Sequence, residues 1–165
     1  MKKLFLMASI VLMTVVLASC GATVPSPVEV TAETPDEEIA KALTATYLSA
    51  LVIDEFTFGD QIADLTEVEV VSKAVNACLA DATFLELNKK GYKLYAVGHA
   101  CKFGSRGANM QMGLKRARQV VNELRALNVN VSLMGAKSLG DTVMTDSEAA
   151  GHPKQRRVTF AVAKR

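Results

Sequence analysis

The sequence predicts a mixed α/β fold, in which helices pack on a partly parallel sheet. Segments with a helical period alternate along the chain with short apolar segments that have the composition of strands. Strands that are separated by helices commonly pair in parallel under those helices. We therefore expect a β-α-β-α-β-β core over about residues 52–165, preceded by an extra N-terminal helix.

Local signals at both ends define the first helix. Thr34 can cap it, Pro35 suits its first position, and Glu37 lies where a capping box requires an acid. Apolar side chains then repeat every four residues, at Ile39, Leu43, Tyr47 and Leu51.

Two further helices are expected. The second should start at a capping box, with Thr66 as the cap and Glu69 three residues later, and end at Gly91. Cys78 lies on its apolar stripe. The third should run from about Asn109 to Leu127.

Apolar and alternating segments predict the strands, and polar segments rich in glycine predict the loops. The expected strands are residues 52–58, 92–98, 129–133 and 158–162, and the expected loops are residues 102–108 and 136–154.

The N-terminus has the layout of a secretory signal. Lys2 and Lys3 precede an apolar segment from Leu4 to Leu17, which is shorter than the roughly 20 residues of a membrane span. The following Leu-Ala-Ser-Cys pattern resembles the lipobox of bacterial lipoproteins. That resemblance implies a signal peptide over residues 1–19, cleavage before Cys20 and acylation of that cysteine.

Composition separates the rest of the chain into a tether and a domain. Residues 20–33 contain glycine, proline and small polar residues without a helical period, so we expect a semi-extended tether. Residues 34–165 are expected to form a single domain.

Removal of residues 1–19 takes away two lysines and no acids, which leaves 17 of the 19 basic residues against 17 acidic ones. This balance and the few aromatic residues argue against a nucleic-acid partner.

From about Phe56 to Val162, the order of elements and several residues resemble the OmpA-like domain, which occurs in peptidoglycan-associated lipoproteins. No single match is specific, but together they cover about two-thirds of the chain in the right order. The matching positions are Val97-Gly98-His99, Gly104, Asn109, Arg116-Ala117, Gly135, Gly140 and Arg156-Arg157-Val158.

The resemblance implies a binding site for diaminopimelate of the peptidoglycan stem peptide. In the family, an aspartate at a strand end takes the ammonium of the ligand, and an arginine on the next helix takes its carboxylate. Arg116 stands at the arginine position, Ala100 at the position of the preceding threonine, and Cys101 at the aspartate position. A thiol is mostly uncharged at pH 7, and loss of one charge-assisted hydrogen bond weakens binding by roughly 10- to 150-fold.

Other interpretations of these residues remain open. His99 and Cys101, with His152, could bind a soft metal such as copper or zinc, although His-x-Cys alone is weak evidence and we expect no cofactor. Cys78 and Cys101 could form a disulfide, but we expect their Cα atoms to lie too far apart.

Catalysis and binding of anions are two more alternatives. Cys101 as a nucleophile would need a base such as His99 and an orienting group such as Asp141 or Asp146. Basic residues near Arg116 and Arg156 could attract an anionic partner, but solvated edges of helices and strands explain them as well. We expect Arg157 to pair with a carboxylate within the fold.

The sequence therefore predicts a non-enzymatic lipoprotein of the outer membrane that faces the periplasm. Gly21 is not the aspartate that commonly marks retention in the inner membrane. The predicted function is non-covalent association with peptidoglycan through a degenerate site of Arg116, Cys101, Ala100 and Asn109. The alternative is a scaffold that has lost peptidoglycan binding and serves as a structural or protein-interaction module for envelope proteins.

Overall fold

A computed structural model of the chain describes residues 34–54, 56, 65–143 and 153–165. The predicted signal peptide, Cys20 and the tether lie outside the described residues, as do Asp146 and His152. In the described part of the chain, no helix combines the length and the apolar character that a membrane span requires.

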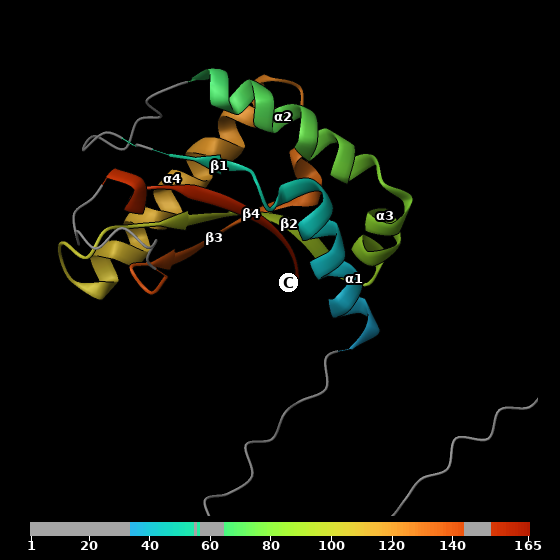
Figure 1. Ribbon diagram of the computed structural model, residues 1–165, viewed down its shortest axis with the longest axis horizontal. Helices are drawn as coiled ribbons and strands as arrows, with labels where there is room; N and C mark the ends of the chain where they lie inside the picture. The colour runs from blue at the N-terminus through green and yellow to red at the C-terminus, as the bar shows by residue number, and fades with distance from the viewer. Residues whose placement is uncertain (1–33, 55, 57–64, 144–152) are drawn as a thin grey trace, which may run out of the picture. The chain divides into compact units, whose positions relative to one another are not determined.

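The described strands form one mixed sheet of four strands in the order β1-β4-β2-β3 (Figure 1). β2 and β3 are parallel, whereas β4 runs antiparallel to both β1 and β2. The expectation of a mixed, partly parallel sheet is confirmed. The strands are β1 (Val52–Ile53), β2 (Tyr92–His99), β3 (Met134–Gly140) and β4 (Val158–Lys164).

Helices pack on this sheet and supply most of the core. α4 contacts β2 and β3, α1 contacts β4, and α3 contacts β2. Buried and partly exposed residues alternate along β4, the pattern of an antiparallel strand with one face against helices. The helices are α1 (Pro35–Leu43), α2 (Leu65–Ala80), α3 (Ala82–Lys89) and α4 (Arg106–Ala126), and a π-helical turn, Thr44–Leu48, continues α1.

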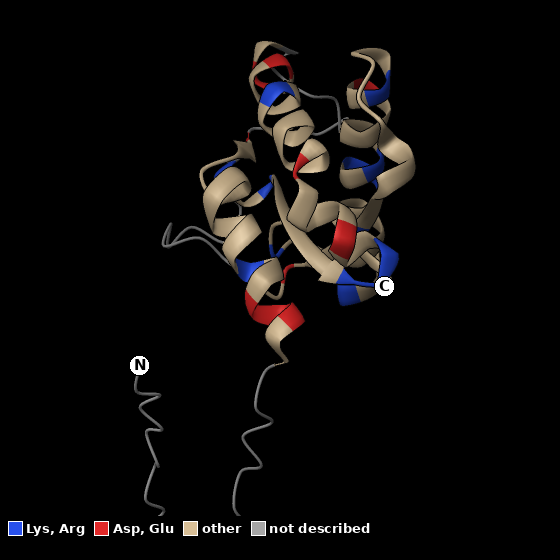
Figure 2. Ribbon diagram, turned by 90° about the vertical axis from the view of Figure 1, so that its right-hand side faces the viewer, with Lys and Arg blue, Asp and Glu red and all other residues tan. Residues whose placement is uncertain are grey.

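The start of the extra N-terminal helix agrees with its capping signals. The carboxylate of Glu37 accepts a hydrogen bond of 2.9 Å from the backbone N–H of Thr34. Figure 2 shows acidic residues in the first turn of α1, where the helix dipole favours negative charge. Asp36 in that turn forms a salt bridge with Lys90, the residue after α3, which ties the added helix to the rest of the domain.

The predicted strand at residues 129–133 is wrong. Val131–Leu133 forms a 3₁₀ turn, and the strand follows it as β3, which extends into the segment expected to be a loop. The side chain of Asn130 accepts hydrogen bonds from the backbone N–H and the hydroxyl of Ser132, which holds this segment in a turn.

The predicted second helix is interrupted, and two helix starts differ from expectation. Asp81 separates α2 from α3 and caps α3, because its carboxylate accepts from the backbone N–H of Thr83 at 2.7 Å. Thr66 lies inside α2 rather than before it. α4 begins at Arg106 with Ser105 as its cap, three residues before the expected start. The expected stop at Gly91 agrees with its φ of +91°.

Candidate functional site

β2 and α4 touch through their backbones at Gly98 and Gly113. A Cβ atom on Gly98 would lie 1.8 Å from the carbonyl oxygen of Gly113, so no larger residue fits without moving one of the two elements. The hydroxyl of Ser138 on β3 donates a hydrogen bond of 3.4 Å to the carbonyl of Gly98 at the same place. This contact fixes the position of α4 on the sheet.

A pocket opens just beyond this contact, between the end of β2 and the first turns of α4. Its volume is about 190 Å³. All four residues that the sequence predicts for the site line it, together with four others from the described part of the chain. The lining residues are Ala100, Cys101, Phe103, Ala108, Asn109, Met112, Arg116 and Arg156.

Two guanidinium groups in this pocket are held by backbone carbonyls. Arg116 is buried, and its Nη1 donates a hydrogen bond of 2.9 Å to the carbonyl of His99. Arg156 is also buried, and its Nε donates to the carbonyl of Phe56 at 2.8 Å. The ring of Phe56 lies 5.8 Å from the Arg116 guanidinium carbon, so this residue contacts both arginines. The sequence signal for Arg156 was the Arg-Arg-Val motif, which gave no indication that it reaches the pocket.

Asn109 and Cys101 complete the polar part of the pocket. Asn109 is only 4% exposed, and its Nδ2 has no hydrogen-bond partner in the described part of the chain. Cys101 is a buried free thiol. Among residues 34–54, 56, 65–143 and 153–165, none that lines the pocket is acidic. The groups with strong hydrogen-bonding capacity here are therefore mainly donors.

The ring of His99 points to β4 rather than to these donors. Its Nε2 lies 3.0 Å from the hydroxyl oxygen of Thr159 on β4. Burial, helped by the positive charge of Arg157, lowers the pKa of His99 to about 4. Within the described ranges, no three side chains among His, Cys, Asp and Glu are grouped to hold a metal ion. His152 of the metal hypothesis lies outside those ranges.

Cys78 lies in the core, where burial and then the charge of Asp81 raise the pKa of its thiol to about 12. Cys78 and Cys101 are both free.

Burial lowers the pKa of Arg157, and the negative charge of the Asp54 carboxylate opposes this shift. Asp54 is therefore an acid whose charge acts on Arg157.

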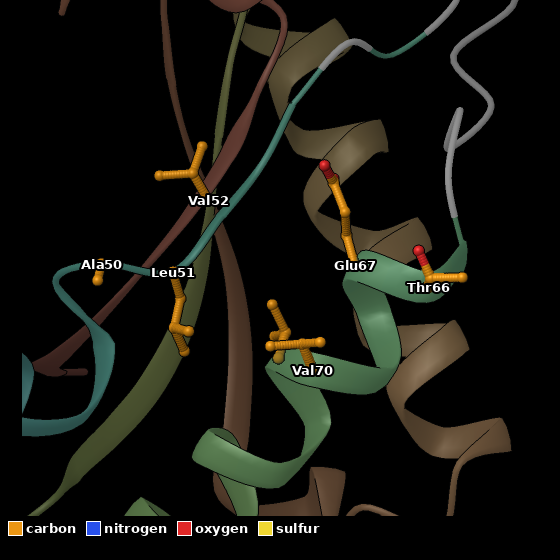
Figure 3. Close-up of a pocket in the computed structure, with 7 residues that line it drawn as sticks. Ala50, Leu51, Val52, Thr66, Glu67 and Val70 are labelled. Carbon is orange, nitrogen blue, oxygen red and sulfur yellow. The ribbon is translucent and has the colours of Figure 1, made fainter.

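A second hollow of about 260 Å³ lies between β1 and α2 (Figure 3). Leu51 and Val70 line it from its two sides. Glu67 also lines it, and its carboxylate accepts a hydrogen bond of 3.4 Å from the backbone N–H of Asp54. The described residues that line this hollow are largely apolar, so the pocket at Cys101 is the better candidate for a binding site.

No protein family and no curated protein matches the chain in comparisons of sequence. Solved structures do match. The peptidoglycan-associated lipoprotein from Burkholderia pseudomallei superposes with a TM-score of 0.51 at 19% identity, over 73% of this chain and 96% of that one. The chain has the OmpA-like fold.

Two further solved structures match the chain at lower similarity. The C-terminal domain of MotB from Helicobacter pylori has a TM-score of 0.49 at 19% identity, over 68% of this chain and 87% of that one. The OmpA-like domain of FopA1 from Francisella tularensis has a TM-score of 0.40 at 16% identity, over 58% and 64% of the two chains.

Proposed function

We propose that the chain is a cell-envelope domain that associates non-covalently with peptidoglycan through the pocket at Cys101. The observation that carries this proposal is the grouping of the buried guanidinium groups of Arg116 and Arg156 with the Nδ2 of Asn109, which has no partner among the described residues. Support also comes from the likeness in fold to a protein named as a peptidoglycan-associated lipoprotein.

The ligand on the cell wall is a carboxylate of the stem peptide. The planar fork of an arginine donates two parallel hydrogen bonds to a carboxylate, and Arg116 is already positioned by the carbonyl of His99. The ammonium of diaminopimelate would find a thiol at Cys101 rather than a carboxylate. The site is therefore degenerate, and crowding of many copies on one membrane compensates for part of the weakened binding.

The proposal includes an anchor in the outer membrane. Acylation of Cys20 would hold the chain there, and residues 20–33 would let the domain reach the cell wall from the periplasmic side. Replacement of Cys20 by serine should abolish incorporation of radiolabelled palmitate and move the protein from the membrane fraction to the soluble fraction. Unchanged labelling in the variant would contradict lipidation at this residue.

We further propose that the domain is not an enzyme. A catalytic thiol needs a base within hydrogen-bond distance. His99 is the histidine next to Cys101 in the sequence, but its ring faces Thr159, and its pKa of about 4 makes it a weak base.

Co-sedimentation with purified peptidoglycan sacculi tests the proposed binding. The full chain in detergent should pellet with sacculi, and Arg116→Ala should remain in the supernatant. Arg118→Ala is the matched control, since Arg118 is an exposed arginine on the same helix outside the pocket. Circular dichroism should show that each variant is folded. Equal pelleting of the two variants would contradict a role for the pocket.

The replacement of the family's acid by Cys101 favours a second candidate, a scaffold that no longer binds peptidoglycan and instead contacts an envelope protein. In that case the wild-type chain would stay in the supernatant, and Cys101→Asp would restore pelleting. This result would show a surviving pocket without its cell-wall role.

A further inference from the structure

The pocket at Cys101 differs in charge from a site built for a zwitterion. A zwitterionic ligand needs one anion and one cation close together in its site. Here Arg116 and Arg156 contribute positive charge, and none of the described residues that line the pocket is acidic. The pocket also lies at the first turns of α4, where the helix dipole adds partial positive charge.

Asn109 gives an independent indication of the kind of ligand that the pocket favours. Its side chain is almost fully buried, and its amide nitrogen is a donor that has no partner among the described residues. A buried donor without a partner destabilises the fold, so a ligand that supplies an acceptor oxygen is stabilised there. The guanidinium groups and this amide thus favour the same kind of group, an anionic oxygen.

The remaining wall of the pocket is apolar. Phe103, Ala108 and Met112 line it beside the neutral Ala100 and Cys101. A volume of about 190 Å³ is smaller than the roughly 300–1,000 Å³ of sites that enclose a whole drug-sized ligand, so this pocket fits the end of a larger molecule.

We propose that the pocket has changed its specificity and takes a peptide carboxylate whose α-nitrogen is an amide, in preference to the zwitterionic end of diaminopimelate. A C-terminal D-alanine of a stem peptide has this chemistry: one carboxylate, one methyl group and no ammonium. The inference rests on the proposed function for the source of the ligand, and on the donors of the pocket for its chemistry.

Three small probes separate these chemistries. N-acetyl-D-alanine carries a carboxylate beside an amide, N-acetyl-D-alaninamide carries no charge, and meso-diaminopimelate carries zwitterionic ends. The full chain, labelled with ¹⁵N in detergent micelles, would be titrated with each probe while the side-chain amide signal of Asn109 is followed by NMR. Asn109→Ala assigns that signal.

We expect N-acetyl-D-alanine to shift the Asn109 signal, its amide analogue to leave it in place, and diaminopimelate to bind at least about tenfold more weakly. Cys101→Asp should reverse the preference for the carboxylate over diaminopimelate. Cys101→Asn, which has the size of the aspartate without its charge, should keep the wild-type preference.

Diaminopimelate binding as tightly as N-acetyl-D-alanine in the wild-type chain would overturn the inference, and so would no shift of Asn109 with any probe. The wild-type titration decides between these results even if a Cys101 variant fails to fold. The proposed function fails separately: carboxylate binding without pelleting on sacculi would remove the cell-wall role and leave the specificity of the pocket intact.

Discussion

The same two elements, β2 and α4, touch at one point and separate at the next. At Gly98 and Gly113 their backbones lie so close that no Cβ fits between them. Cys101, which follows Gly98, and Asn109, which precedes Gly113, line an open pocket nearby. The contact sets the spacing of the two elements where the pocket begins, and donors from different parts of the chain line that pocket. Residues at the contact should therefore affect stability, and residues in the pocket should affect binding.

Gly98→Ala should have the largest effect. The added methyl group would meet the backbone of Gly113, which cannot rotate away as a side chain can, so we expect a loss of more than about 3 kcal/mol in the free energy of unfolding. Urea denaturation followed by circular dichroism measures this loss.

Gly107→Ala is the matched control for this clash. Gly107 also lies on α4, but a Cβ there would have no atom within 4 Å. We expect it to leave the stability unchanged or raise it by up to about 1 kcal/mol, because alanine favours the helix. Equal losses at the two glycines would mean that close packing of β2 on α4 does not hold the fold.

His99 lies between the contact and the pocket, and it should make stability depend on pH. Its pKa in the folded chain is about 4, because burial and Arg157 disfavour the charged ring. In the unfolded chain the value is about 6.5, so the unfolded state binds more protons between these two pH values. The free energy of unfolding should therefore fall by about 2–3 kcal/mol as the pH decreases from 6.5 to 4.

His99→Gln should remove this part of the pH dependence, because glutamine does not titrate. The comparison uses the difference between variant and wild type at each pH, since carboxylates titrate near the lower limit in both. His152→Gln should keep the wild-type dependence. If instead His152→Gln flattens the curve, the titration belongs to the other histidine.

The sequence did not predict the contact between Gly98 and Gly113, because the close approach of two backbones depends on how α4 packs on the sheet. The pocket residues Arg116, Ala100, Cys101 and Asn109 were predicted through the resemblance to the OmpA-like domain. Arg156 was missed as a pocket residue, because it approaches from the start of the last strand, and that position depends on how β4 pairs with β2.

β3 shows why the missed strand could not be read from its own residues. Glycine disfavours strands, yet Gly135 pairs with Tyr95 on β2, and a Cβ there would lie 2.4 Å from the tyrosine ring. Lys137 covers the same ring from β3, with its Nζ 3.8 Å from the ring centre. The need for glycine comes from a partner on another strand, forty residues earlier in the chain.

Ser138→Ala probes the contact more gently than a glycine substitution. Its hydroxyl donates to the carbonyl of Gly98 and accepts from the backbone N–H of Gly140. Loss of these hydrogen bonds should cost about 0.5–1.5 kcal/mol, measured by the same denaturation experiment. Ser132→Ala, outside this contact, serves to show the effect of losing a hydroxyl elsewhere. A cost near zero at Ser138 would mean that its hydroxyl adds nothing to the contact between Gly98 and Gly113.

Asn109→Ala should have the smallest effect on stability and the opposite sign. The change removes a buried donor that has no partner in the described part of the chain, and it places a better helix former near the start of α4. We expect the free energy of unfolding to stay the same or to rise by up to about 1 kcal/mol, while binding of N-acetyl-D-alanine weakens. A clear loss of stability would mean that Asn109 holds the fold together. A gain in stability with a loss of binding would show that this side chain is kept for the ligand, on the open side of the same two elements that Gly98 and Gly113 hold closed.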